Sequence, residues 1–147
     1  EALSRLWQAR HNAHYATLSM RPGAAVWGTD VCVPISQLTD LIKLTEADVR
    51  GAPFFVTMVG HVGDGNFHVG FLIDPNNAAE VALASQFNTT LVQRAIALDG
   101  TCTGEHGVGS GKCKFMEREH GAGIVVMRAI KQALDPDGIM NPGKVLP

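Results

Sequence analysis

The dipeptide Asp64-Gly65 constrains the fold most strongly, because it separates two stretches rich in β-branched and aromatic residues, 54–62 and 66–73. Asp-Gly between two such stretches is typical of a two-residue β-hairpin turn. With that turn, His61 lies opposite His68 on one face of the hairpin. The other face is predicted to meet the core, because it pairs Val62 with Phe67, Gly60 with Val69, Met58 with Phe71 and Val56 with Ile73.

Helical and extended patterns surround the predicted hairpin. Residues 2–19 carry apolar side chains at helical spacing, and residues 24–33 are rich in small and β-branched residues, as strands are. Ser36 is expected to cap a helix that runs to about residue 48, and Asp74 with Pro75 to begin another that runs to about residue 98. A glycine-rich loop, 100–111, precedes one further helix, or two helices broken near residues 121–123. The pattern predicts a single α+β domain over residues 1–147, with a mainly antiparallel sheet and helices on one face.

Composition excludes several classes of partner. The 147 residues carry 12 Lys and Arg against 14 Asp and Glu, which gives no reason to expect nucleic acid. Apolar runs are too short to span a bilayer. The three cysteines lack metal-type spacing and are expected to be reduced thiols. The chain opens within a helical pattern and without Met, so we expect a fragment that is truncated at its N-terminus.

Two histidines on neighbouring strands can bind one divalent cation, because opposed side chains on an antiparallel pair lie roughly 5 Å apart. A carboxylate commonly completes such a site, and Glu105 in the loop GTCTGEHGVGSG can supply it. His106 is then free to act as a base. The alternatives are a polar cross-strand pair on a solvated face and a phosphate-binding glycine loop, although neither GxxxxGK[ST] nor GxGxxG is present. Asp64 and Asn66 are expected to shape the turn rather than to bind metal.

Several segments together resemble one enzyme family. They are GHVGDGNFHVGFL, GTCTGEHGVGSGK, LDPDGIMNPGKVL, LWQARHNAHYA and GTDVCVPISQL, and they cover nearly the whole chain in order. They resemble the C-terminal part of flavin-linked 2-hydroxy-acid dehydrogenases: the D-lactate dehydrogenases, the glycolate oxidase flavin subunit and the D-2-hydroxyglutarate dehydrogenases. The D-lactate dehydrogenase branch is the most similar.

The resemblance implies an FAD-binding domain of the vanillyl-alcohol-oxidase type, followed by a ferredoxin-like cap that holds zinc or manganese. It implies that His61, His68 and Glu105 are metal ligands and that His106 is the catalytic base. It further implies that Arg10 pairs with the substrate carboxylate, although Arg10 could instead be a solvated helix charge. It also implies that Asn141 lies in the C-terminal segment that packs against the flavin side of the site. Asp30 is expected to anchor either Arg10 or the glycine-rich loop.

The FAD-binding domain itself is missing from the chain. We therefore expect the fragment to be inactive alone and to need that domain as its partner, with a small D-lactate-like 2-hydroxy acid as substrate. The electron acceptor stays undetermined and homo-oligomerisation stays open. The expected location is the cytoplasm, the periphery of the bacterial inner membrane, or the mitochondrion of a eukaryote. Two other hypotheses remain: a free-standing metal-binding or hydrolytic domain, and a binding module without metal.

Overall fold

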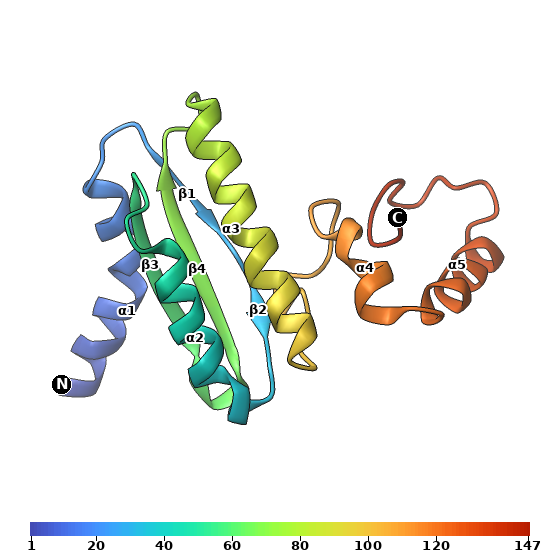
Figure 1. Ribbon diagram of the computed structural model, residues 1–147, viewed down its shortest axis with the longest axis horizontal. Coiled ribbons are helices and arrows are strands. Elements are labelled where there is room, and N and C mark those ends of the chain that lie inside the picture. Colours follow the sequence, from blue (N-terminus) through green and yellow to red (C-terminus); the bar gives the residue numbers. More distant parts are fainter.

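The computed structural model describes residues 1–147 and has two parts, an α/β body and a C-terminal arm (Figure 1). The body contains the helices α1 (Ala2–Ser19), α2 (Ile35–Val49) and α3 (Ala78–Ala97). Its strands are β1 (Ala25–Gly28), β2 (Val31–Cys32), β3 (Phe55–His61) and β4 (Asn66–Ile73). The arm contains α4 (Cys113–His120) and α5 (Gly123–Leu134), so the predicted break near residues 121–123 is confirmed.

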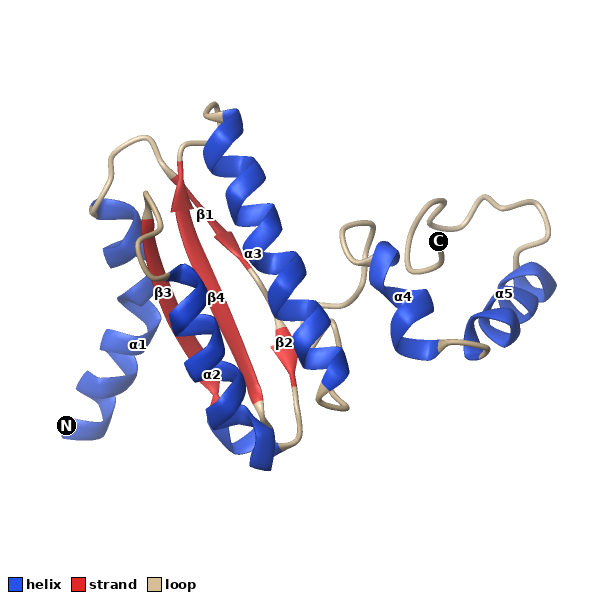
Figure 2. Ribbon diagram, in the orientation of Figure 1, coloured by secondary structure: helices blue, strands red, loops and turns tan.

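Strand β4 is the centre of the sheet and pairs antiparallel with all three other strands. Strands β1 and β2 follow each other along one edge of β4, and β3 pairs with the other edge (Figure 2). The predicted α+β class with an antiparallel sheet is confirmed. The predicted strand over residues 24–33 is present in two pieces, because pairing is interrupted at Thr29 and Asp30.

The hairpin turn is longer than predicted. Residues Val62–Asp64 form a short 3₁₀ turn, and Gly65 follows it with a φ of 73°. A Cβ at Gly65 would lie 2.0 Å from the Val33 carbonyl oxygen, so both the backbone angle and the space require glycine. The loop thus holds four residues, and His61 pairs with Asn66 while Val59 pairs with His68. The predicted direct pairing of His61 with His68 is therefore wrong, although a shift of two residues keeps both on the same face.

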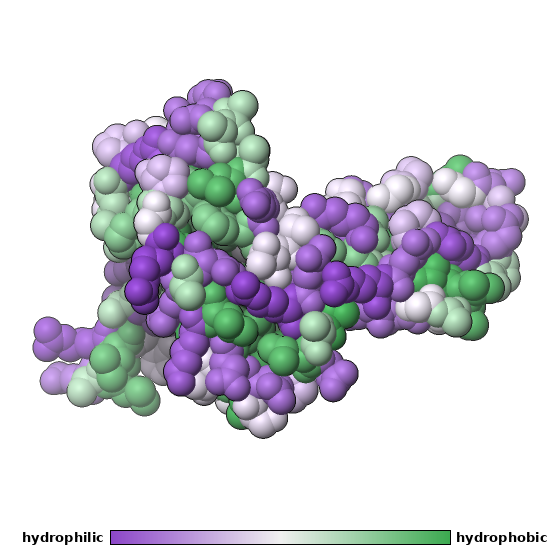
Figure 3. All heavy atoms as spheres, in the orientation of Figure 1, coloured by the Kyte–Doolittle hydropathy of each residue, from purple (hydrophilic) through white to green (hydrophobic).

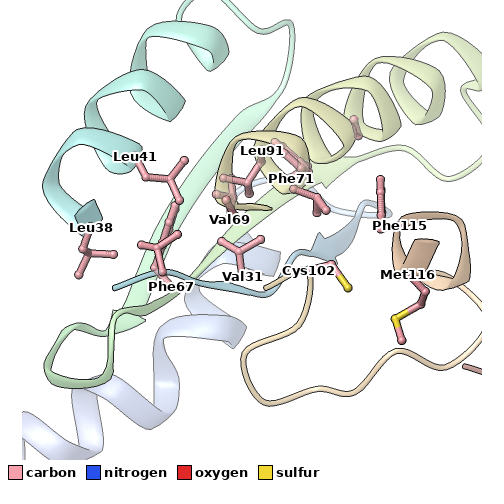
Figure 4. Packing of buried hydrophobic residues seen from close by; sticks show 14 of the residues in the cluster. Val31, Leu38, Leu41, Phe67, Val69, Phe71, Leu91, Cys102, Phe115 and Met116 are labelled. Atoms are coloured by element: carbon pink, nitrogen blue, oxygen red, sulfur yellow. The ribbon is translucent and has the colours of Figure 1, made fainter. Parts of the chain in front are cut away.

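The face of the sheet that was predicted to be apolar does meet the core. Phe67, Val69, Phe71 and Ile73 of β4 are buried there. Helices α2 and α3 cover this face, and Figure 4 shows Leu38, Leu41 and Leu91 packed over it together with Val31 of β2. The arm joins the same cluster through Phe115 and Met116 of α4.

Helix α1 lies against the opposite face of the sheet. It has no buried residue, and it lines a groove together with residues of β1, β3 and β4. We call this cavity of about 430 Å³ the α1 groove. No helix of the protein combines the length and the hydrophobicity that a transmembrane span needs.

Two predicted helix caps are wrong. Pro34 rather than Ser36 precedes α2 and offers no side-chain cap. Helix α3 begins later than predicted, because the side chain of Asn77 rather than Asp74 accepts the N–H groups of Ala79 and Glu80. Asp74 instead shapes the turn that precedes the helix, by accepting the N–H of Asn76.

Candidate cation and substrate site

The site lies on the face of the sheet that turns away from the core. His61 of β3 and His68 of β4 are diagonal neighbours there, with ring centroids 5.9 Å apart. Glu105 approaches from the loop between α3 and α4. Its Oε1 atom lies 2.9 Å from Nε2 of His68 and 3.3 Å from Nε2 of His61. We call these three residues the His–Glu cluster.

The His–Glu cluster has the donor set of a borderline divalent cation. One ligand atom from each of its residues lies within 4.8 Å of the other two. Ligand bonds of 2.0–2.2 Å in tetrahedral geometry place donor atoms about 3.4 Å apart, so only small shifts would admit zinc or manganese. Two imidazoles and one carboxylate also leave a coordination position for substrate or water. The residues therefore fit the cation that the sequence predicts.

The His68 ring is oriented by the backbone of the interrupted strand. Its Nδ1 atom lies 3.1 Å from the carbonyl oxygen of Thr29 and 3.6 Å from Oδ1 of Asp30. Because both neighbours are acceptors, the ring proton belongs on Nδ1, which leaves the lone pair of Nε2 free for a cation. The side chain is only 12% exposed, so this orientation is well fixed.

Asp30 holds the glycine-rich loop in place. It is fully buried, and its register beside β4 places it across from His68. Four donors reach its carboxylate at 2.8–3.0 Å: Nδ2 of Asn66, Oγ1 of Thr103 and the backbone N–H groups of Glu105 and His106. Lys112 adds its ammonium group, at 3.3 Å from Oδ2 and 3.0 Å from the Asp30 carbonyl oxygen. Of the two partners predicted for Asp30, the loop is thus the one found.

The charge on Asp30 is stabilised by these donors. Burial raises the pKa of this carboxyl, but the N–H groups of His106 and Glu105 and the Asn66 and Thr103 side chains lower it more. The net result is a pKa well below the usual range of aspartate. Asp30 therefore stays a carboxylate at any pH near neutrality and fixes the backbone that carries Glu105 and His106.

His106 stacks on His68, with ring centroids 4.8 Å apart and planes tilted by 10°. Its side chain is 56% exposed, and its Nε2 lies 4.0 Å from Glu105. Together with His68 it lines the α1 groove, which also contains Arg10 and His14 of α1. The structure thus places the predicted base, one predicted metal ligand and the predicted carboxylate-binding arginine around one cavity.

Asn141 is the one predicted site residue that lies elsewhere. It adopts a φ of 48° and lines a second groove on the arm, with Met127, Ile130 and Leu134 of α5. No residue of the His–Glu cluster lines that groove. A role of Asn141 toward the flavin stays a prediction.

Sequence reasoning missed the supporting residues Thr103 and Lys112. Both act through Asp30, and they are separated from it by 73 and 82 positions. A usable signal was the polar pair Thr29-Asp30 inside an otherwise strand-like stretch, because a carboxylate there needs several donors from elsewhere in the fold.

Comparison with known proteins finds similar flavin-linked and D-lactate dehydrogenase sequences. The chain is 50% identical to "Probable D-lactate dehydrogenase, mitochondrial" of Danio rerio over 147 residues, which cover 99% of this chain and 30% of the relative. It is 43% identical to "D-lactate dehydrogenase [cytochrome], mitochondrial" of Arabidopsis thaliana, covering 100% of this chain and 26% of that protein. It is 35% identical to "Glycolate oxidase subunit GlcD" of Bacillus subtilis, covering 95% of this chain and 30% of that protein.

The chain therefore spans less than a third of the length of these relatives. A family match extends over residues 1–145 and carries the description "FAD linked oxidases, C-terminal domain". The family that the sequence motifs resemble is thereby confirmed: this chain belongs to the C-terminal domain family of the FAD-linked oxidases.

Proposed function

We propose that this chain is the substrate- and cation-binding part of an FAD-dependent dehydrogenase that oxidises a D-lactate-like 2-hydroxy acid. One observation carries the proposal: Arg10, His68 and His106 line the same groove, and His68 joins that groove to Glu105 of the His–Glu cluster. A carboxylate-binding group, a base and a cation site can together hold a 2-hydroxy acid and take up the proton of its hydroxyl group. Family membership favours this function over the hydrolytic alternative.

Each residue has a distinct role in the proposal. The guanidinium of Arg10 binds the substrate carboxylate in a planar, two-point contact and stays charged. His106 accepts the proton of the 2-hydroxyl group. The chemistry that FAD would supply is uptake of the hydrogen on the same carbon with its electron pair, which would leave a 2-keto acid, reduced flavin and a protonated base. A divalent cation, zinc or manganese, supplies Lewis-acid chemistry that lowers the pKa of the substrate hydroxyl.

The lining of the α1 groove supports a substrate with one carboxylate and a small side chain. Arg10 is the single Lys or Arg among its lining residues. Much of the remaining wall is apolar and includes Ala13, Val26 and Val59. A second carboxylate on the substrate would meet no second cation in this wall, whereas a methyl group would be accommodated.

FAD and its binding domain complete the proposal. The chain matches a C-terminal domain and spans less than a third of its relatives, so we propose that another part of a longer protein holds FAD, and that this chain alone is inactive. Exposed apolar residues suit such a contact: Leu3, Leu6 and Trp7 of α1 and Val125, Val126 and Ile130 of α5. Figure 3 shows apolar residues gathered at the α1 end and on the arm. For a eukaryotic source we propose a mitochondrial location, because two of the relatives are named as mitochondrial.

A chimaera tests the proposal. The 147-residue chain would replace the matching segment of the Danio rerio relative, and D-lactate-dependent reduction of an artificial electron acceptor would be measured. We expect turnover that falls by at least about 100-fold with His106→Ala, within the range typical of a lost general base. Arg10→Ala should raise the KM for D-lactate. Arg5→Ala, at an exposed position of α1 that does not line the groove, should change neither the KM nor the turnover. An FAD-loaded chimaera that is folded but inactive toward 2-hydroxy acids would contradict the proposal.

A further inference from the structure

Asn66 carries the one buried side-chain polar atom of the protein that has no hydrogen-bond partner. The residue is 5% exposed, and the orphaned atom is Oδ1. An unpaired carbonyl oxygen in the interior costs about 1–3 kcal/mol. Such an atom at the edge of a cation site indicates a partner that the polypeptide itself does not supply.

The orientation of the Asn66 amide is fixed chemically. Its Nδ2 atom donates to Oδ1 of Asp30 at 2.8 Å and to the Val31 carbonyl oxygen at 3.0 Å. Both partners are acceptors, and Asp30 is a carboxylate, so an amide turned by 180° would place three oxygens together. The NH₂ group must therefore face the β2 side of β4, and Oδ1 must point away from it.

The strand on the other side of Asn66 from β2 is β3, which carries His61 of the His–Glu cluster. Asn66 lies across the ladder from His61 and two residues before His68, so all three side chains share one face of the sheet. Asn66 also lines one small cavity together with His61, Glu105 and Gly104. Gly104 makes room for the amide, because a Cβ there would lie 2.0 Å from Nδ2 of Asn66.

We propose that Oδ1 of Asn66 is a fourth protein donor to the cation of the His–Glu cluster. This assignment replaces the expectation that Asn66 only shapes the turn, and it rests on the cation site of the proposed function. A carboxamide oxygen is a hard ligand, and together with the Glu105 carboxylate it gives a donor set of two nitrogens and two oxygens. Hard donors suit manganese better than they suit zinc. Asn66 thereby raises the affinity for Mn²⁺ more than the affinity for Zn²⁺.

Cation affinity measured on the whole chain tests this assignment. Dissociation constants for Zn²⁺ and Mn²⁺ would be obtained by competition with a chromophoric chelator for wild type, Asn66→Ala and Asn66→Ser. We expect both variants to lose about 10–100-fold in Mn²⁺ affinity and less in Zn²⁺ affinity. Thr103→Val is the matched control, since it removes one donor to Asp30 and leaves Asn66 intact; it should bind within about threefold of wild type.

A spectroscopic count of bound water gives a second readout. Broadening of the Mn²⁺ electron paramagnetic resonance signal in ¹⁷O-water reports how many waters coordinate the ion. Asn66→Ala should hold one more water than wild type, because a water replaces the lost carboxamide oxygen. An equal count in the two proteins, or a loss of affinity in Thr103→Val as large as in Asn66→Ala, would overturn the assignment.

The outcome separates this inference from the proposed function. Wild-type affinity in the Asn66 variants, together with lost binding in His68→Ala, would remove Asn66 from the ligands and leave the cation site standing. Failure of wild type itself to bind either cation would overturn both.

Discussion

The two faces of strand β4 are built on different principles. On one face, Phe67, Val69 and Phe71 are at most 2% exposed and pack beneath α2 and α3. On the other face, His68 and Asn66 meet hydrogen-bond partners from residues 29–31, and α1 lines an open groove beside His68. The same eight-residue strand thus supplies both the core of the protein and the chemistry of its site.

The difference shows how the two faces are stabilised. The core face gains free energy in proportion to the apolar area removed from water. The site face depends on one buried carboxylate, Asp30, that orders groups from two distant segments. Truncating the core face should therefore destabilise the fold strongly, whereas truncating an exposed site residue should leave the stability nearly unchanged and remove cation binding.

The largest effect on stability is expected from the core face. Phe71→Ala should lower the free energy of unfolding by about 3–5 kcal/mol, because a fully buried aromatic ring leaves a cavity. Urea denaturation followed by circular dichroism measures it. Phe55→Ala, on the site face and 46% exposed, is the matched control and should cost about 1 kcal/mol or less. Equal losses in the two variants would remove the distinction between the faces.

Asp30→Asn should have the next largest effect, about 3 kcal/mol. The substitution leaves several donors facing a neutral amide whose NH₂ group adds a donor of its own. Denaturation of this variant and of Asp40→Asn, an exposed position in α2, gives the comparison. A cost below about 1 kcal/mol would mean that the loop keeps its conformation without the charge.

Asp30 also predicts a direction of pH dependence. Because its pKa is lowered in the folded state, its stabilising contribution is present above the unfolded value of about 3.9 and is lost as pH falls toward the folded value. Wild-type stability should therefore drop steeply below about pH 4. Denaturation midpoints measured from pH 6 to pH 2 should show a smaller drop for Asp30→Asn. Parallel curves for the two proteins would contradict the assignment.

Gly104→Ala should cost about 1–3 kcal/mol, because the added Cβ overlaps the Asn66 amide. Hydrogen exchange of the Glu105 and His106 amides should quicken in this variant, as both are held by Asp30. Gly111→Ala is the control in the same loop, since a Cβ there meets no atom within 4 Å.

The smallest effects are expected at the exposed ends of the site. His61→Ala and His106→Ala should change the cation-free stability by less than about 0.5 kcal/mol, because their side chains are 47% and 56% exposed. Thermal unfolding in the presence of a chelator measures this. A cost above about 2 kcal/mol for either would show that the site face also stabilises the fold.

Local patterns in the sequence predicted much of this molecule. The alternation in residues 66–73 identifies the two faces of β4. A register error of two residues leaves each side chain on its predicted face. The register itself depends on Gly65 fitting against the Val33 carbonyl, a contact between segments that only the fold brings together. The same reason explains why the choice between the two predicted partners of Asp30 could not be made from the sequence, and why the orphaned oxygen of Asn66 was not foreseen. The groups concerned lie on separate strands and a distant loop.

The most direct test of the account is the metal content of the untagged chain. Inductively coupled plasma mass spectrometry would be applied to wild type and to the His61→Ala, His68→Ala double variant, after loading with zinc or manganese and removal of the excess. The account predicts about one cation per wild-type chain and none in the variant. A folded wild-type protein that retains no cation, or a double variant that retains as much as wild type, would contradict the central claim that the outer face of the hairpin is a cation site.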